Sequence, residues 1–219
     1  MKAQTQNILL KIYNSLYNYF GPLNWWPGDS PFEIMVGAIL TQNTSWSNVE
    51  KAINNLKKED LLEPWKLYRI NQDELARLIR PSGYYNIKAR RLKSFITFFV
   101  EEYNGSEKKM FSDDSEELRR KLLKIKGIGP ETADSILLYA GNKPFFVVDA
   151  YTKRIFSRHK LISKDATYHQ IQEFFVQSLG REAKLFNEFH AQIVMLGKTI
   201  CTSRNPACSK CPIAFLISE

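Results

Sequence analysis

No apolar run in the 219-residue sequence approaches the roughly 20 residues that a membrane-spanning helix needs. The first 20 residues form an amphipathic pattern and lack the apolar stretch and the small-residue cleavage site of a secretory signal. We therefore expect an intracellular, cytoplasmic protein with no membrane partner.

Cysteine is scarce, and its three copies, Cys201, Cys208 and Cys211, all lie in the last 19 residues. An odd, clustered set does not suit a disulfide framework and favours a bound metal or cluster.

The alternating pattern of β-strands is also scarce, and residues 144–149 (PFFVVD) form the one short β-like run. Most other segments repeat apolar residues at helical spacing, and helix-opening residues recur at Ser30, Asn71 and Asp114. There is no internal repeat and no low-complexity linker. The sequence therefore predicts an all-α fold of about nine to eleven helices.

The charge balance points to an anionic partner. Lysine and arginine outnumber aspartate and glutamate by 31 to 23, which gives a net charge of +8, and an apolar fraction of 44% can fill a core. Such an excess favours nucleic acid or an anionic membrane surface, although charge alone fits an incidentally basic enzyme equally well.

Residues 115–140 predict two helices joined by a tight turn, KGIGP, at Lys126 to Pro130. Gly127 and Gly129 allow backbone conformations that a Cβ would forbid, and proline suits the first position of the second helix. We expect Ile128 to anchor the turn in the core while the backbone N–H groups face outward and bind a phosphate. An ordinary glycine turn is the alternative interpretation.

Asp149 follows the apolar run PFFVV, eighteen residues after Glu131. Its position suits a helix N-cap, which is the simplest role for an aspartate there. A carboxylate at this place can also project into a cleft and act as an electrostatic stabiliser or a base.

Several motifs in one order resemble the endonuclease III (helix-hairpin-helix-GPD) superfamily of DNA glycosylases. GAILTQNTSW resembles the family's helix whose glutamine, here Gln42, enters the DNA. RPSGYYN resembles its wedge loop, with Tyr84 at the intercalating position. The KGIG turn and then Asp149 follow in the family's order. The resemblance implies two α-helical lobes with the active site in the groove between them, Asp149 as the catalytic residue, and contacts to DNA from Lys126, Gly127 and Gly129.

The resemblance covers residues 1–219 as a single glycosylase fold. We expect one helical lobe at residues 32–103, with the DNA-penetrating elements. The second lobe would combine residues 1–31 with 115–219 and hold the hairpin, the catalytic aspartate and the cysteine loop.

The chain departs from the family pattern at Glu131. Bifunctional members carry there a lysine that attacks the sugar, forms a Schiff base and then cuts the backbone. A carboxylate cannot form a Schiff base, so the resemblance implies a monofunctional enzyme that uses water and leaves an abasic site.

Three tryptophans indicate which kind of damaged base the enzyme would remove. Trp25, Trp26 and Trp46 resemble the corresponding positions of bacterial 3-methyladenine glycosylases in this superfamily, where aromatic rings would stack on a flipped cationic base. Core packing is the alternative, most of all for Trp26. Basic residues flank the wedge loop and Asp149 and could contact phosphates; they are Arg77, Arg80, Lys88, Arg90, Arg91, Lys93, Lys153, Arg154, Arg158 and Lys160.

The spacing C-x6-C-x2-C resembles the start of the family's iron–sulfur loop, but Ile217 stands where the family has a fourth cysteine. The three cysteines could hold a [4Fe–4S] cluster with an unusual fourth ligand, bind zinc, or form an empty loop.

These observations favour a monofunctional glycosylase for alkylated purines, nucleoid-associated and monomeric, acting on double-stranded DNA with a damaged base. An endonuclease III-like glycosylase and lyase for oxidised or mismatched pyrimidines is the alternative. A non-catalytic DNA-binding module is a third interpretation.

Overall fold

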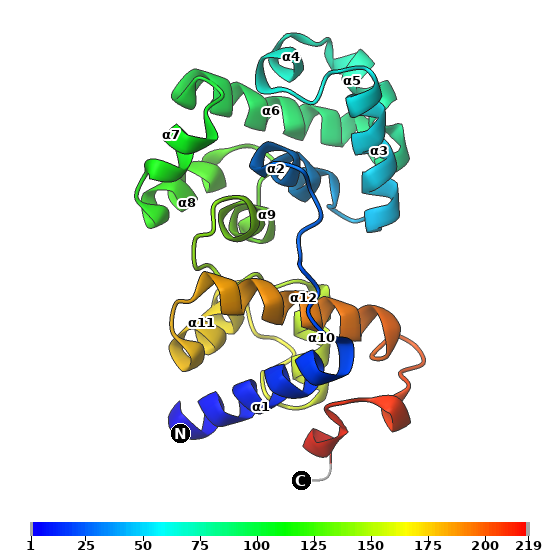
Figure 1. Ribbon diagram of the computed structural model, residues 1–219, viewed down its shortest axis with the longest axis vertical. Coiled ribbons are helices and arrows are strands. Elements are labelled where there is room, and N and C mark those ends of the chain that lie inside the picture. The colour runs from blue at the N-terminus through cyan, green and yellow to red at the C-terminus, as the bar shows by residue number, and fades with distance from the viewer. Residues whose placement is uncertain (1, 218–219) are drawn as a thin grey trace. The chain divides into compact units, whose positions relative to one another are not determined.

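The computed structural model describes residues 2–217, and the regular elements in that range are all helices, which confirms the all-α class (Figure 1). It has twelve α-helices in the described part, more than expected, because segments such as Pro64–Arg69 and Glu107–Ser112 form helices of only six residues. Residues 144–149 run without helix or strand, so their β-like pattern predicts an extended, buried segment rather than a sheet. No helix in the described range has the length and apolar character needed to span a bilayer.

The chain divides into two compact units: the central unit, residues 26–141, and the terminal unit, residues 1–25 with 142–219. This division differs from the expected lobes, because the hairpin segment 115–141 belongs to the central unit and not with the termini. Packing explains the difference. The first hairpin helix, α8 (Ser115–Lys124), contacts α7 (Glu107–Ser112), and the second, α9 (Pro130–Ser135), contacts α2 (Pro31–Leu40), so both pack within the central unit.

The central unit is built around the long helix α6, which packs against α2, α4, α5 and α7. Its core contains the fully buried rings of Phe95 and Phe99, stacked 5.9 Å apart, together with Met35 and Ile39. Its elements are α2 (Pro31–Leu40), α3 (Trp46–Lys58), α4 (Pro64–Arg69), α5 (Gln72–Leu78), η1 (Arg80–Ser82), α6 (Tyr85–Tyr103), α7 (Glu107–Ser112), α8 (Ser115–Lys124), α9 (Pro130–Ser135) and the π-helical turn η2 (Ile136–Ala140).

The terminal unit joins the first helix to the last third of the chain, with α1 packed against α11 and α12. Its core is a cluster of phenylalanines in which Phe146 stacks on Phe175 at 3.8 Å and Phe156 meets Phe175 edge-on at 4.8 Å. Its elements are α1 (Lys2–Phe20), α10 (Ala150–Arg158), α11 (Tyr168–Leu179), α12 (Ala183–Thr199), η3 (Cys208–Lys210) and η4 (Ala214–Ile217).

Candidate functional site

The turn between α8 and α9 needs glycine at one position for its own packing. Gly127 has φ +95°, and a Cβ there would lie 2.3 Å from Cγ of Arg91, so both the conformation and the space require glycine. Ile128 is buried, as expected, and anchors the turn. Gly129 differs from the prediction, since its φ of −94° is open to any residue.

Gly129 is nevertheless exposed, and a Cβ at this position would meet no protein atom within 4 Å. Glycine suits this position as the N-cap of α9, and the open space there would also let an external group approach the backbone closely. Lys126, two residues before Ile128, is exposed on the same turn.

Gln42, just beyond the end of α2, is held against this turn. Its Nε2 donates to the backbone oxygen of Gly127 at 3.1 Å and to Oγ1 of Thr132 at 2.9 Å, and its Oε1 accepts from the guanidinium of Arg91. The structure thus brings together two motifs that are 85 residues apart in sequence. Thr132 and Arg91 complete the arrangement, and no sequence motif singled them out for this role.

Tyr84 is the most exposed large hydrophobic side chain among those identified, at 68% exposure. It lies in the left-handed region at φ +47° and precedes the first residue of α6. That conformation is uncommon for a residue with a bulky side chain. An exposed aromatic ring at the start of a rigid helix has the shape expected of a wedge.

Lys88 is buried to 1% exposure and joins the two segments that carry Gln42 and Tyr84. Its ammonium donates to the backbone oxygen of Leu40 at 2.7 Å, at the end of α2, and to that of Ser82 at 2.6 Å, in η1. The expectation that Lys88 contacts phosphate is therefore wrong. Burial, with a smaller contribution from the charge of Arg91, lowers the pKa of Lys88 to about 8.

This depressed pKa predicts a pH dependence. The unfolded chain keeps the Lys88 proton up to an ordinary pKa of 10.5, while the native chain releases it near 8, so the unfolded state binds more protons between these values. The free energy of unfolding of the wild type, relative to Lys88→Met, should rise by about 2 kcal/mol from pH 8 to pH 10. Urea unfolding of both proteins across this range measures the difference; a difference that stays constant or falls would contradict the prediction.

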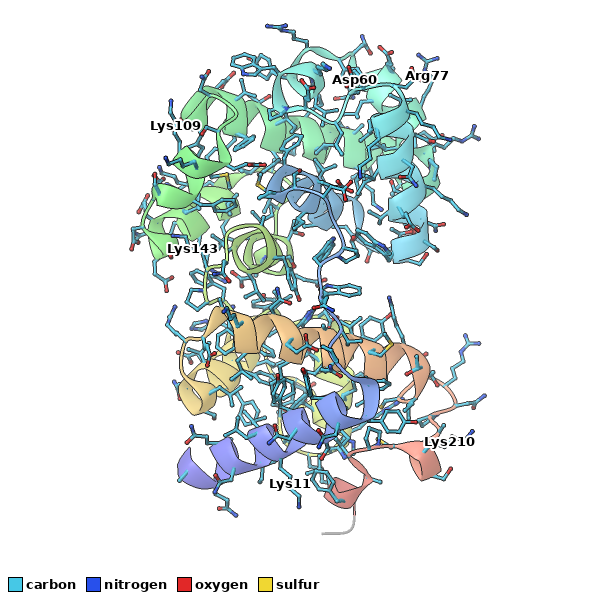
Figure 2. All side chains as sticks on the ribbon, in the orientation of Figure 1. Lys11, Asp60, Arg77, Lys109, Lys143 and Lys210 are labelled. Atoms are coloured by element: carbon cyan, nitrogen blue, oxygen red, sulfur yellow. The ribbon has the colours of Figure 1, made fainter. Side chains whose placement is uncertain are left out.

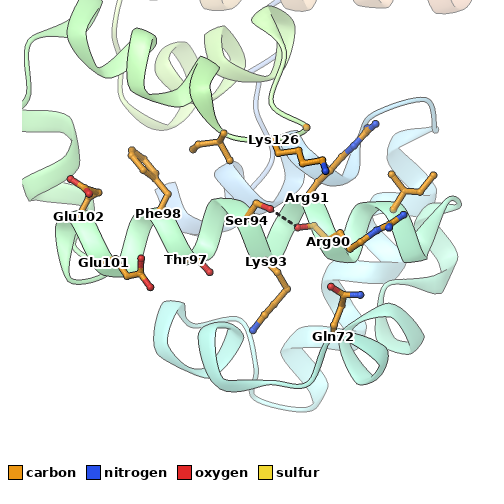
Figure 3. A pocket seen from close by; sticks show the side chains of 13 residues that line it. Gln72, Arg90, Arg91, Lys93, Ser94, Thr97, Phe98, Glu101, Glu102 and Lys126 are labelled. Carbon is orange, nitrogen blue, oxygen red and sulfur yellow. Dashed lines mark hydrogen bonds between the residues drawn. The ribbon is translucent and has the colours of Figure 1, made fainter.

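A groove of about 1060 Å³ runs along α6 beside the hairpin turn, lined by Arg90, Arg91 and Lys126 among others (Figure 3). Not every basic residue near it is available to a ligand. Lys93 donates to the backbone oxygens of Leu67, Tyr68 and Ile70 and so holds the end of α4. The exposed basic residues that remain around the wedge loop are Arg77, which reaches outward in Figure 2, Arg80 and Arg90.

Trp26 and Trp46 form an aromatic cluster in the central unit. Their rings meet at right angles with centroids 5.3 Å apart, and Tyr139 lies 5.1 Å from Trp26. The cluster covers Gly37 of α2, where a Cβ would lie 3.3 Å from Nε1 of Trp26. Tyr139 is an addition that the sequence did not single out, because nothing in its local pattern distinguishes it from a core residue.

Trp25 belongs to the terminal unit. The ammonium of Lys198, on α12, lies 5.5 Å from its ring centroid, within the range of a cation–π contact.

Asp149 is the N-cap of α10, as predicted. Its Oδ1 accepts from the backbone N–H of Thr152 at 2.7 Å and from the hydroxyl of the same residue at 2.9 Å, while Oδ2 lies 3.5 Å from Nε2 of His190. The side chain is 13% exposed. Burial alone would raise the pKa of Asp149, but His190 and the hydrogen bonds from Thr152 outweigh it and hold the pKa below its usual value.

Asp149 can therefore cap the helix and carry a negative charge at the same time, because Oδ1 accepts the capping hydrogen bonds while the carboxylate stays ionised. His190, on α12, is buried beside Asp149 and gives it a partner.

The cysteine loop is fixed to α10 by two arginines. Arg154 donates to the backbone oxygens of Cys201 and Gly197, and Arg158 donates to those of Thr202 and Ser203 and to Sγ of Cys201 at 3.3 Å. Arg154 is half-buried and its guanidinium is engaged with backbone oxygens, contrary to the expectation of a phosphate contact. Arg158 stays exposed while it holds the loop, so its contact with a phosphate stays a prediction. Burial first, and then the neighbouring thiols, raise the pKa of Cys211.

Residues 36–180 match the family model described as HhH-GPD superfamily base excision DNA repair protein. The chain belongs to this family. It is accordingly a base excision repair glycosylase, and the non-catalytic interpretation loses its support. Residues 201–216 match a second model, the iron-sulfur binding domain of endonuclease III.

Individual relatives agree with this assignment. A protein of Methanocaldococcus jannaschii, provisionally named DNA repair glycosylase MJ1434, is 50% identical over 100% of both chains. Endonuclease III of Thermotoga maritima is 32% identical over 83% of this chain and 79% of its own. The H. pylori 3-methyladenine DNA glycosylase bound to 1,N6-ethenoadenine superposes with a TM-score of 0.75 at 32% identity, over 89% of this HhH-GPD chain and 97% of the other.

The cysteine loop of this HhH-GPD protein fits an iron–sulfur cluster in its donor chemistry. All three cysteines line one cavity of about 220 Å³, several times the roughly 30 Å³ share of one water molecule. In residues 2–217, no group of three or more histidine, cysteine or acidic side chains is placed to hold a single metal ion. Cysteine thiolates are the usual ligands of iron–sulfur clusters, so the three cysteines are suitable donors for one. When bound, a [4Fe–4S] cluster would cross-link the loop and contribute to folding stability.

Proposed function

We propose that the chain is a monofunctional, monomeric DNA glycosylase that hydrolyses the N-glycosidic bond of alkylated purines, such as 3-methyladenine, in double-stranded DNA. The observation that carries the proposal is the pair of carboxylates Glu131 and Asp149. By the resemblance, Glu131 takes the place of the lysine that the lyases use, and the surroundings of Asp149 hold its carboxylate ionised.

Asp149 supplies what hydrolysis of such a base requires. As the bond between sugar and base breaks, its electron pair moves into the base and neutralises the positive charge of an alkylated purine. The sugar becomes an oxocarbenium-like cation, which the ionised carboxylate of Asp149 stabilises. Water then adds to the sugar carbon and loses a proton, which leaves an abasic site and a free base.

Binding of DNA would use the central unit. The turn at Lys126, Gly127 and Gly129 offers backbone N–H groups and a lysine to a phosphate, and the open space at Gly129 allows close approach. Tyr84 would enter the duplex, and Gln42 would do so by exchanging its hydrogen bonds to the hairpin turn for bonds to a base. Lys88 holds the segments that carry both residues. The enzyme would take the target base out of the stack, as chemistry on a base requires.

The base pocket would be aromatic. Trp46 and Trp26 form its proposed wall in the central unit, and Trp25 remains a candidate from the terminal unit. Stacking a cation on a desolvated tryptophan contributes about 2 kcal/mol. The similarity to the H. pylori glycosylase, whose bound ligand is a modified adenine, supports a purine pocket.

Trp46→Ala should lower the rate of 3-methyladenine release roughly 30-fold, the equivalent of that stacking energy, and leave affinity for undamaged duplex nearly unchanged. Trp65→Ala is the matched control, since Trp65 is an exposed tryptophan of α4 in the same unit. Single-turnover base release and duplex binding are measured for both. Equal losses of rate in the two variants, or no loss in Trp46→Ala, would show that Trp46 does not line the base pocket.

Glu131 predicts that no Schiff base forms. Borohydride added during turnover of lesion-containing duplex should trap no covalent complex, and strand breaks should appear only after alkali. Glu131→Lys, which places an amine at this position, is the comparison in which trapping should become detectable. A trapped adduct in the wild-type protein would contradict the monofunctional proposal.

The endonuclease III-like alternative also has support, because the Thermotoga relative carries that name at the same 32% identity. Release of 3-methyladenine, 1,N6-ethenoadenine, thymine glycol and uracil from otherwise identical duplexes distinguishes the two. We expect both purine lesions to be released far faster than either pyrimidine. A preference for thymine glycol or uracil would replace the proposal with the alternative.

A further inference from the structure

The three cysteines leave one position of a cubane cluster without a thiolate. Each of the four irons in a [4Fe–4S] cluster takes one external ligand, normally cysteine. Cys201, Cys208 and Cys211 provide three, and the residue at the fourth position of the spacing is Ile217, whose hydrocarbon side chain has no donor atom.

The cavity that the cysteines line contains one further donor. Its other described lining residues are Ile200 and Pro206, which have apolar side chains, Arg158, and His159. A guanidinium has no lone pair to offer a metal, whereas a neutral imidazole is a common metal ligand. His159 is therefore the one side chain on this lining, apart from the thiols, that can bind iron.

The placement of His159 agrees with such a role. It is the C-cap residue of α10, so its backbone is fixed by the hydrogen bond from its N–H to the oxygen of Ile155 at 3.2 Å. Its Nδ1 is buried and has no hydrogen-bond partner among the described residues. A buried ring nitrogen is normally satisfied by hydrogen bonding or by a metal.

Arg158, which precedes His159, holds the cysteine loop against the end of α10. Arg158 binds Sγ of Cys201 and the backbone oxygens of Thr202 and Ser203, which ties the start of the loop to the last turn of α10. A ligand from α10 would thus complete a set whose other members come from a loop already fastened to the same helix.

We propose that His159 is the fourth protein ligand of a [4Fe–4S] cluster held by Cys201, Cys208 and Cys211. Replacing an anionic thiolate by a neutral imidazole makes the cluster less negative by one charge, so its reduction becomes easier than that of a four-cysteine cluster. The inference concerns the cysteine loop alone and is independent of the lesion that the enzyme removes.

Pulsed electron paramagnetic resonance tests the ligand directly. The full chain is prepared without oxygen, reconstituted with iron and sulfide, and reduced. The spectrum should show the strong ¹⁴N coupling of an iron-bound imidazole, and ¹⁵N-histidine should replace it with the corresponding ¹⁵N signal. His159→Ala should lose the coupling, while His169→Ala, which alters an exposed histidine of α11, should keep it.

A second variant shows whether the loss in His159→Ala comes from a missing ligand or from a folding defect. His159→Cys restores a four-thiolate set, so it should hold a cluster without nitrogen coupling and with a lower reduction potential than the wild type. The proposal is overturned if the wild type shows no directly bound nitrogen, if the coupling persists in His159→Ala, or if the reconstituted chain contains zinc or no metal in place of iron.

Discussion

Asp149→Asn should abolish base release, with a loss of at least about 100-fold in the single-turnover rate, while binding to undamaged duplex is retained. The substitution removes the charge and little else. Asparagine is as good an N-cap as aspartate, so the bond from the N–H of Thr152 to the side-chain oxygen can persist and α10 should keep its start. The loss would therefore report on stabilisation of the sugar cation.

A matched substitution separates charge from capping. Asp114 caps α8 in the central unit, where its Oδ1 accepts from the N–H groups of Glu116 and Glu117, and it is exposed. Asp114→Asn should release 3-methyladenine at close to the wild-type rate. If Asp149→Asn is folded by circular dichroism and still excises at that rate, Asp149 is a helix cap and the proposed chemistry fails.

The local elements of this fold were predictable because their causes are local. Ser30, Asn71 and Asp114 each begin a helix in the structure, and each side chain accepts from a backbone N–H two or three residues ahead. Asp149 does the same for α10. A capping residue needs no distant partner, so its sequence position carries the whole signal.

The division of the chain could not be predicted in the same way. Which unit receives residues 115–141 depends on contacts of α8 and α9 with helices distant in sequence, and local patterns do not encode these contacts. Residues 144–149 show that a local pattern can have two explanations. Their apolar residues suit a β-strand, but they suit equally well a segment that buries Phe146 among other phenylalanines, as the structure has it.

Sequence motifs singled out Gln42, Tyr84 and Gly127 as candidates, and the structure gives each a distinctive geometry, while their roles on DNA stay predictions. Lys88 and Arg91 were grouped with surface charges, because sequence does not reveal whether a lysine or arginine on a helix faces solvent or spans two backbone segments. Only the fold distinguishes these cases.

The two helices of the hairpin are joined by an ion pair that sequence reasoning did not predict. Arg119 of α8 binds Asp134 of α9 in a bidentate manner, with Nε to Oδ1 at 2.6 Å and a terminal nitrogen to Oδ2 at 3.0 Å. The side chain of Asp134 is 0% exposed and that of Arg119 is 19% exposed. The pair joins the two helices on either side of the KGIG turn.

Arg119→Met should lower the free energy of unfolding by about 3–5 kcal/mol, because it keeps the apolar stem but removes the guanidinium from a buried carboxylate. Arg120→Met is the matched control one residue away, where the guanidinium is exposed and pairs with Glu117 on the surface, and it should change stability by no more than about 0.5 kcal/mol. Combining Arg119→Met with Asp134→Leu should recover most of the loss, since no buried charge then remains. Chemical denaturation of the four proteins measures these differences. Equal, small effects at positions 119 and 120 would show that the pair does not hold the hairpin.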